Sequence, residues 1–181
     1  ILFTSDNGAC YEWGPFGFDQ VSRKGFTRLH EGDELKGVGG PGTYHSVGSA
    51  WSCQSNTPLR MYKPFNHEGG NCSTLLAHWP KGISKPNRWV RDPIHLIDFM
   101  PTLLEIGGVD YPKKFKDEKL IPVEGRSLLP FFKGAGKASE RVLCFDHFDS
   151  SAIRKGDWKL VRGNNRFKNR TWELYNLAED R

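Results

Sequence analysis

The feature that most constrains the fold is a series of short apolar runs near the C-terminal end of the chain. Three stretches are rich in aromatic and β-branched side chains: RVLCFDHF at 141–148, SAIRKGDWKLV at 151–161 and TWELYNL at 171–177. The middle stretch is interrupted by Lys155-Gly156-Asp157, a combination typical of a tight turn. Runs of this length and composition, separated by turn residues, are typical of antiparallel strands. They predict a small four-stranded antiparallel β subdomain.

The part of the chain before these runs carries the signals of strands that alternate with helices. ILFTSDNG at 1–8 is an apolar run that ends in turn-forming residues, and CSTLLAHWP at 72–80 predicts a short buried strand. A short helix is expected within 51–62, interrupted at Thr57-Pro58. Residues 9–50 show no sustained period, and we expect them to form a long loop that walls a site.

A longer helix is expected to begin at Asp92-Pro93, because a carboxylate can cap the first turn and proline fits the first helical position. Pro101 would kink or restart this helix, and Gly107-Gly108 would end it. Its apolar side chains could face a sheet. Strand, helix and strand segments in this order predict an α/β domain over 1–125, followed by the β subdomain, with a helix, over 126–181.

Composition excludes several classes of protein. The 26 Lys and Arg residues against 21 Asp and Glu give a net charge of +5, but most are scattered rather than gathered in a stripe with stacking aromatics. Nucleic acid is therefore not an expected partner. No apolar stretch is long enough to span a membrane. The four cysteines form no C-x-x-C pair, so a zinc ribbon or redox motif is not expected and their disulfide state stays open.

Two polar residues at the end of the first apolar run are candidate metal ligands. Asp6 and Asn7 offer hard oxygen atoms at the carboxyl end of an expected strand, where ligands collect in open α/β sheets. Asp-Asn-Gly is also an ordinary turn sequence. Two adjacent oxygens cannot complete the shell of calcium or magnesium, so the local sequence leaves both readings open.

A second candidate segment is PLRMYKPFNHEGG at 58–70, which gathers Arg60, Lys63, His67 and Glu68 before two glycines. A lysine ammonium is a compact point charge that suits a sulfate or phosphoryl oxygen. The alternative is a solvated basic loop, and a single histidine is more often a structural hydrogen-bond partner than a catalyst. The segment alone does not decide between these possibilities.

Taken together, the ordered segments resemble the C-terminal half of the sulfatase family, within the alkaline-phosphatase-like superfamily, and most of all its bacterial arylsulfatase branch. The resemblance spans essentially the whole chain. It rests on the order of these stretches: FTSDNG, YKPFNHEGG running into TLLAHWPKGI, HLIDFMPTLLEIGGVDYP, GRSLLPFF, and AIRKGDWKLV followed by WELYNLAEDR. The implied fold is part of an alkaline-phosphatase-like α/β core, followed by the small β subdomain.

The resemblance also implies roles for particular residues. Asp6 and Asn7 correspond to the pair that ligates a divalent cation, usually calcium, in sulfatases. Lys63 lies five residues before the Glu of the E-G-G motif, the place of the lysine that contacts the substrate sulfate. His67 would at most line the pocket. Two residues of the β subdomain, on one side of the cleft in the family, would be substrate contacts: His147 and Arg154.

The implied reaction is hydrolysis of a sulfate ester, either a small molecule or a sulfated glycan. Sulfatases attack sulfur with hydrated formylglycine, made from a Cys or Ser in a C/S-x-P-S/A-R motif, while a divalent cation polarises a sulfate oxygen. A general acid, usually His, releases the alcohol. Many bacterial members are exported, so a periplasmic or extracellular location is implied.

The chain departs from the family pattern in one large respect. It contains no C/S-x-P-S/A-R motif, and the paired acidic ligands that sulfatases place near their N-terminus are also missing. Because the chain begins without Met inside an expected strand, we interpret it as the C-terminal portion of a longer sulfatase, inactive by itself. The alternatives are a phosphatase, phosphodiesterase or phosphonate hydrolase of the same superfamily, or a catalytically dead module that binds anions.

Overall fold

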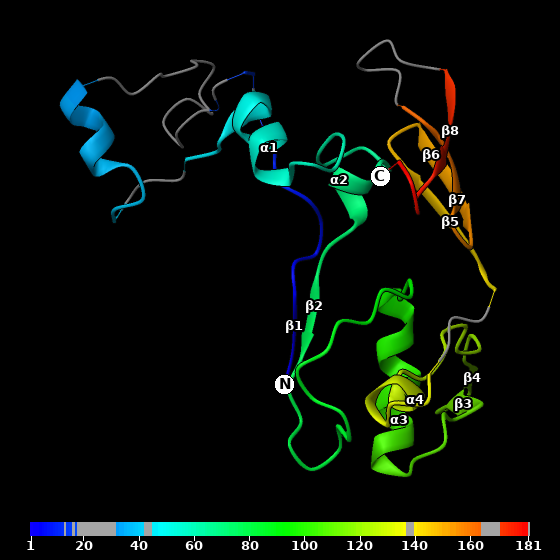
Figure 1. Ribbon diagram of the computed structural model, residues 1–181. Coiled ribbons are helices and arrows are strands. Elements are labelled where there is room, and N and C mark those ends of the chain that lie inside the picture. The colour runs from blue at the N-terminus through cyan, green and yellow to red at the C-terminus, as the bar shows by residue number, and fades with distance from the viewer. Residues whose placement is uncertain are drawn as a thin grey trace. The chain divides into compact units, whose positions relative to one another are not determined.

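The structure is a computed structural model that describes residues 1–12, 14–15, 17, 32–41, 45–136, 140–163 and 171–180. Contacts within the chain divide it into two compact units. One comprises residues 1–2 and 77–139, and the other comprises residues 3–76 and 140–181. Figure 1 shows the elements of both units in chain order. The expected long loop at 9–50 lies largely outside the described residues, although a 3-10 helix, η2, covers Gly32–Gly37.

The first unit is built around the helix α3, Phe99–Gly107, which follows directly on the 3-10 helix η3, Leu96–Asp98. A short helix α4, Leu129–Phe132, packs against α3, and two short strands, β3 and β4, form an antiparallel pair. Their bounds are Lys114–Phe115 and Glu118–Lys119. The predicted end of the helix is confirmed, because Gly108 follows α3 in the left-handed conformation that favours glycine. Pro101 lies in the first turn of α3, where proline is tolerated.

The predicted start of this helix at Asp92 is wrong. The first helical turn begins at Leu96, and His95 is its N-cap. The His95 side chain accepts from the backbone N–H of Ile97 at 3.3 Å, while the Asp98 carboxylate accepts from the backbone N–H of His95 at 2.8 Å. This reciprocal capping box satisfies two backbone donors and outweighs the local preference for Asp92-Pro93.

The two strands predicted in the first half are present but are not buried. β1, Leu2–Thr4, pairs with β2, Leu75–Ala77, in a two-stranded sheet. β2 is half-buried at its first residue and exposed at the other two, so the expectation of a buried strand is wrong. Among the residues described, this sheet has two strands only, and a two-stranded sheet offers too little apolar surface to form a core of its own.

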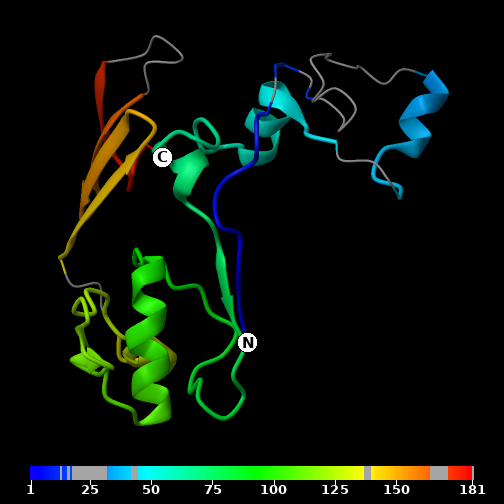
Figure 2. The same ribbon diagram turned by 180° about the vertical axis from the view of Figure 1, so that it is seen from behind.

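The second unit contains the four-stranded antiparallel sheet, and this prediction is confirmed. The strands are β5 (Val142–His147), β6 (Ser150–Lys155), β7 (Trp158–Arg162) and β8 (Trp172–Asn176), in that order across the sheet. They lie side by side in both Figure 1 and Figure 2. The helix predicted within 126–181 does not belong with this sheet, because α4 groups with α3 in the first unit. The division at 125/126 stays a prediction.

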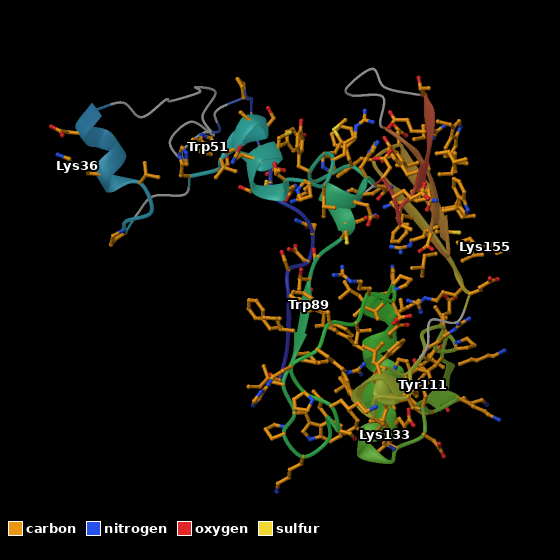
Figure 3. The ribbon with its side chains drawn as sticks, in the orientation of Figure 1. Lys36, Trp51, Trp89, Tyr111, Lys133 and Lys155 are labelled. Carbon is orange, nitrogen blue, oxygen red and sulfur yellow. The ribbon has the colours of Figure 1, made fainter. Side chains whose placement is uncertain are left out.

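Side chains alternate between the two faces of this sheet, as the period of a strand requires. One face carries the buried Leu143, Ala152 and Val161, whereas Ile153 and Trp158 on the other face are exposed. Side chains drawn on the ribbon show Lys155 on the exposed face, at the end of β6 (Figure 3).

The remaining helices of the second unit are α1, Gly48–Asn56, and the single turn α2, Glu68–Asn71. The helix predicted within 51–62 therefore begins earlier and ends before Thr57-Pro58. Tyr11, Tyr62 and Phe65 form a small aromatic core beside these helices. No helix among the described residues is long and apolar enough to cross a membrane.

Candidate functional site

The candidate metal ligands lie in the loop that follows β1. The Ser5 hydroxyl donates to the Asn7 carbonyl oxygen at 2.9 Å, and the Asn7 amide donates to the Gly8 carbonyl oxygen at 2.9 Å. Asp6 is exposed and Asn7 is half-buried. The turn predicted from Asp-Asn-Gly therefore forms, and it leaves the Asp6 carboxylate at the surface.

This loop runs directly beside the segment that carries Lys63. The backbone N–H of Lys63 donates to the Ala9 carbonyl oxygen at 3.2 Å, and Cys10 and Lys63 form a parallel β-bridge. The backbone N–H of Gly8 donates to the Gly70 carbonyl oxygen at 2.9 Å. The loop after β1 and the Lys63 segment, more than fifty positions apart in sequence, are thus joined by backbone hydrogen bonds, and we call this pair of segments the backbone layer. The Asp6-Asn7 turn lies at its edge.

The backbones approach so closely that side chains would not fit between them. A Cβ atom built on Gly8 would lie 1.7 Å from the Gly69 carbonyl oxygen. A Cβ atom built on Gly69 would lie 2.0 Å from the Met61 carbonyl oxygen. Gly8 is therefore required by the close packing of the two loops against each other, and Gly69 by the close packing of its own loop at Met61.

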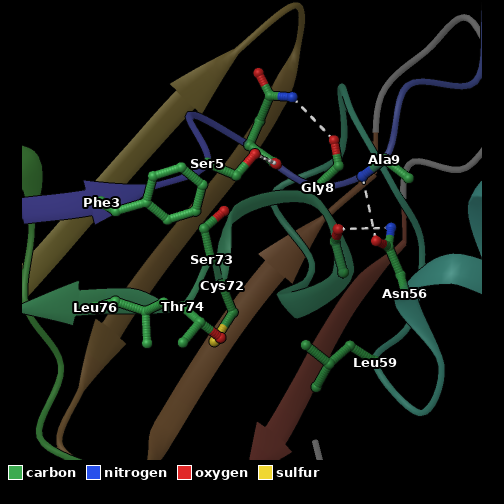
Figure 4. A pocket seen from close by; sticks show the side chains of 12 residues that line it. Phe3, Ser5, Gly8, Ala9, Asn56, Leu59, Cys72, Ser73, Thr74 and Leu76 are labelled. Atoms are coloured by element: carbon green, nitrogen blue, oxygen red, sulfur yellow. Dashed lines mark hydrogen bonds between the residues drawn. The ribbon is translucent and has the colours of Figure 1, made fainter.

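Asn56, at the end of α1, joins that helix to both of these loops. Its amide nitrogen donates to the carbonyl oxygens of Met61 at 2.9 Å and Gly69 at 2.8 Å, and its amide oxygen accepts from the backbone N–H of Ala9 at 3.2 Å. Figure 4 shows the bonds to Gly69 and Ala9. Sequence reasoning missed this residue, because nothing in the local pattern distinguishes it from any other asparagine at the end of a helix.

An open pocket of about 370 Å³ lies beside Asn56 and the loops that it joins (Figure 4). Its walls come from the loop after β1, from Asn56 and Leu59, and from the stretch between α2 and β2. Lys63 and His67 are not among its lining residues.

The Lys63 segment is also bound to the four-stranded sheet, at three places. The first is Asn66, whose backbone N–H donates to the Ser150 hydroxyl at 3.1 Å and whose amide donates to the Ser150 carbonyl oxygen at 2.6 Å. Asn66 and Ser150 are both buried, so β6 holds the segment through a fully enclosed polar contact.

The second contact is a buried ion pair between α2 and β7. The Lys159 ammonium donates to the Glu68 carboxylate at 2.7 Å and to the Asn71 amide oxygen at 3.0 Å, and the Arg154 guanidinium lies 3.9 Å from Glu68. Burial alone would raise the pKa of Glu68, but the Lys159 ammonium reverses this and lowers it. Burial lowers the pKa of Lys159, although Glu68 opposes the change. Breaking such a pair leaves one charge buried without compensation.

The third contact gathers three donors around Glu173 on β8. The Glu173 carboxylate accepts from the Arg60 guanidinium at 2.8 Å, lies 3.1 Å from His67 Nε2, and also accepts from the Tyr175 hydroxyl. Burial lowers the pKa of His67 even though Glu173 lies beside it. Burial and the bond to Glu173 raise the pKa of Tyr175 to about 12.

The candidate site residues are therefore placed unequally. Lys63 is half-buried, and its ammonium forms no hydrogen bond or ion pair with the residues described. His67 is 2% exposed and pairs with Glu173, while its Nδ1 has no hydrogen-bond partner in the described part of the chain. Arg154 donates to the Gly156 carbonyl oxygen and lies near Glu68. His147 is exposed at the end of β5. Their roles in substrate binding stay predictions.

Lys159 and Glu173 are residues of this region that sequence reasoning missed. A signal was present in both cases, because alternation within WKLV places Lys159 on the same side as Val161, the buried side, and alternation within WELY places Glu173 with Tyr175. A charged residue at a core-facing position of a strand requires a buried partner.

The residues present fit part of a divalent-cation site. A carboxylate and an amide oxygen are ligands that calcium and magnesium accept, and the Asn7 amide nitrogen is already used by Gly8, which leaves its oxygen for a ligand. No group of three or more His, Cys, Asp or Glu side chains in the described ranges could hold a metal ion. Asp6 and Asn7 can therefore supply two ligands of a larger set.

Comparison with known families identifies the class of protein. Residues 61–181 match the family described as N-sulphoglucosamine sulphohydrolase, C-terminal. The match covers the Lys63 segment from Met61 onward and the whole four-stranded sheet. The chain therefore belongs to this family of sulfatase C-terminal regions.

Relatives that match between 58% and 100% of this chain are also named as sulfatases. An uncharacterised sulfatase of Schizosaccharomyces pombe is 28% identical over 189 residues, which cover 100% of this chain and 33% of the relative. An arylsulfatase of Klebsiella aerogenes is 29% identical over 71% of this chain and 27% of its own length. Mouse steryl-sulfatase is 32% identical over 58% of this chain and 15% of its own length. The chain thus spans a third or less of the length of these relatives.

Proposed function

We propose that this chain is the C-terminal part of a sulfatase whose whole form hydrolyses sulfate esters with a formylglycine nucleophile and a divalent cation, calcium or magnesium. Its α/β portion would complete an alkaline-phosphatase-like core. The substrate would be a small-molecule or glycan sulfate ester, and a periplasmic or extracellular location accords with the family resemblance. By itself the chain would be inactive, because it holds neither the nucleophile motif nor the paired acidic ligands.

The observation that carries this proposal is the backbone layer that joins the Asp6-Asn7 turn to Lys63. The N–H of Lys63 bonds to Ala9, two residues after Asn7, so the two predicted site elements lie side by side. The Lys63 ammonium has no bond to the described residues, and its segment pairs with the loop that carries Asp6 and Asn7. This supports a site in which an anionic group would be held by a cation and an ammonium together. The family match to the Lys63 segment supports the same assignment.

In the proposed reaction, the residues of this chain bind and orient the sulfate group. Lys63 would contact sulfate oxygens and stabilise the negative charge that grows on them and on the leaving oxygen. Asp6 and Asn7 would hold the divalent cation, which acts as a Lewis acid toward a sulfate oxygen when bound. The nucleophile and the general acid would come from outside the site elements described here.

Paired substrates test this proposal. Full-length protein assayed on an aryl sulfate and the matching aryl phosphate should prefer the sulfate, and Lys63→Ala should lower kcat/KM for the sulfate by about 100-fold or more. The control is Lys155→Ala, which removes an exposed lysine on the outer face of the sheet and should leave kcat/KM unchanged. A strong phosphate preference would instead favour a phosphatase, phosphodiesterase or phosphonate hydrolase. Sulfate binding without turnover of either ester would indicate a dead anion-binding module.

A further inference from the structure

The four-stranded sheet contacts the Lys63 segment both before and after the lysine in sequence. Arg60 lies three residues before Lys63 and His67 lies four residues after it, and both contact the same carboxylate, that of Glu173 on β8. The Glu173 side chain is 19% exposed and also accepts from Tyr175. One carboxylate therefore closes a ring of contacts around the turn that presents Lys63.

This ring defines where the lysine backbone can lie. Between Arg60 and His67 the chain makes three further contacts with other segments: the Met61 carbonyl oxygen with the Asn56 amide, the Lys63 N–H with Ala9, and Asn66 with Ser150. The side chain of Lys63 itself bonds to none of the described residues, so the position of its ammonium depends on the backbone that carries it. Displacing a charge by about 1 Å at a reacting group is enough to cost a large factor in rate.

We propose that Glu173 is a positioning residue for Lys63: by holding Arg60 and His67 together, it fixes the loop that presents the lysine to the sulfate group. This inference rests on the proposed function, because it takes Lys63 to be the sulfate-binding lysine. Glu173 itself touches no substrate in this scheme.

A double-mutant cycle in the full-length protein tests the inference. Glu173→Gln keeps the shape of the side chain but removes its charge, and it should lower kcat/KM for an aryl sulfate about tenfold or more. In a Lys63→Ala background the same change should have almost no further effect, because the group through which Glu173 acts is gone. If Glu173 had a purely structural role, the fold-losses in kcat/KM from Glu173→Gln and from Lys63→Ala would multiply in the double variant. The control is Glu179→Gln, which changes an exposed glutamate just after β8 and should leave kcat/KM unchanged.

A second readout does not depend on turnover. Calorimetric titration with inorganic sulfate should show weaker binding for Lys63→Ala and for Glu173→Gln, with no further loss in the double variant. Arg60→Met serves where Glu173→Gln fails to fold, because the Arg60 side chain is half exposed and its removal breaks one side of the same ring.

The outcomes separate the two proposals. If Lys63→Ala lowers activity but the effect of Glu173→Gln or Arg60→Met multiplies with it, the inference is overturned and the proposed function stands. If Lys63→Ala leaves both activity and sulfate binding unchanged, the proposed function fails, and the inference fails with it.

Discussion

At the scale of single residues, the structure shows which partners the charged side chains of the Lys63 segment have. His67 is enclosed between Phe65 and Tyr175 with Glu173 on its Nε2, and its place on the wall of a substrate pocket stays a prediction. Its neighbour Glu68 is equally enclosed, with Lys159 on its carboxylate. Sequence reasoning found that this segment carries charge, but it could not find the partners, because they lie about a hundred residues away in sequence.

The buried His67 gives the stability of the protein a defined pH dependence. Its pKa is lowered in the folded state, so the unfolded chain binds the proton more readily, and stability falls as pH decreases below the unfolded value near 6.5. Urea unfolding at several values between about pH 5 and pH 8 should show this slope, and His67→Gln should flatten it.

The control for this measurement is His147→Gln, which changes an exposed histidine at the end of β5 and should keep the slope. Glu68 also makes stability depend on pH, but it does so in a separate and more acidic pH range, because its pKa is lowered from 4.5. Stability from this group is lost as pH falls through the folded-state pKa. An unchanged slope in His67→Gln would show that another group is responsible.

At the scale of elements, turn chemistry explains why the four strands were predictable. β6 and β7 are joined by Gly156-Asp157, and Gly156 has the positive φ of 58° that glycine adopts without strain. β1, β2 and the helix start were harder to predict. Burial of β2 depends on neighbours that its own sequence does not encode, and the start of η3 depends on a capping box whose N-cap, His95, lies three residues beyond the predicted cap.

The turn between β5 and β6 is less favourable and can be improved. Phe148 and Asp149 both have positive φ, 46° and 64°, in a two-residue turn closed by the pair His147 and Ser150. Non-glycine residues pay a steric cost in this region, which asparagine and glycine largely avoid. Replacing the pair with Asn-Gly should raise the free energy of unfolding by about 1 kcal/mol, measured by thermal or urea unfolding.

The matched control is Asp157→Gly in the neighbouring turn, where Gly156 already supplies the positive φ. This change should bring no gain, because Asp157 is not in the left-handed region and glycine adds entropy to the unfolded chain. Equal gains from both changes would contradict the explanation from turn geometry.

At the scale of the whole molecule, the family and the C-terminal sheet could be predicted from the ordered segments, but the site could be predicted only in part. Asp6, Asn7 and Lys63 were candidates from the local sequence and received their roles from the resemblance, and the structure joins the segments that carry them through backbone bonds at Gly8 and Ala9. Asn56, Lys159 and Glu173 hold that arrangement and were not named. Strand alternation places Lys159 and Glu173 on the core-facing side of the sheet, but it does not identify their partners, which lie in distant segments.

The number of metal ligands in the chain predicts how tightly it binds calcium. Asp6 and Asn7 supply two oxygen ligands, whereas calcium takes six to eight. Calorimetry of this 181-residue chain should therefore show a calcium dissociation constant of about 1 mM or weaker. An Asp6→Asn variant is the control and should abolish even this weak heat. Tight, stoichiometric binding would mean that the remaining ligands come from this chain.

The long sequence separation of the contacts around Lys63 has a consequence for how the protein is made. Glu68 meets its partner 91 residues later, and Arg60 meets its partner 113 residues later. During synthesis the lysine loop leaves the ribosome long before β7 and β8 are synthesised. Its charged groups therefore stay exposed to water until these strands fold over them. A premature stop codon before residue 172 would yield a protein that retains Lys63 and loses the carboxylate that holds its loop.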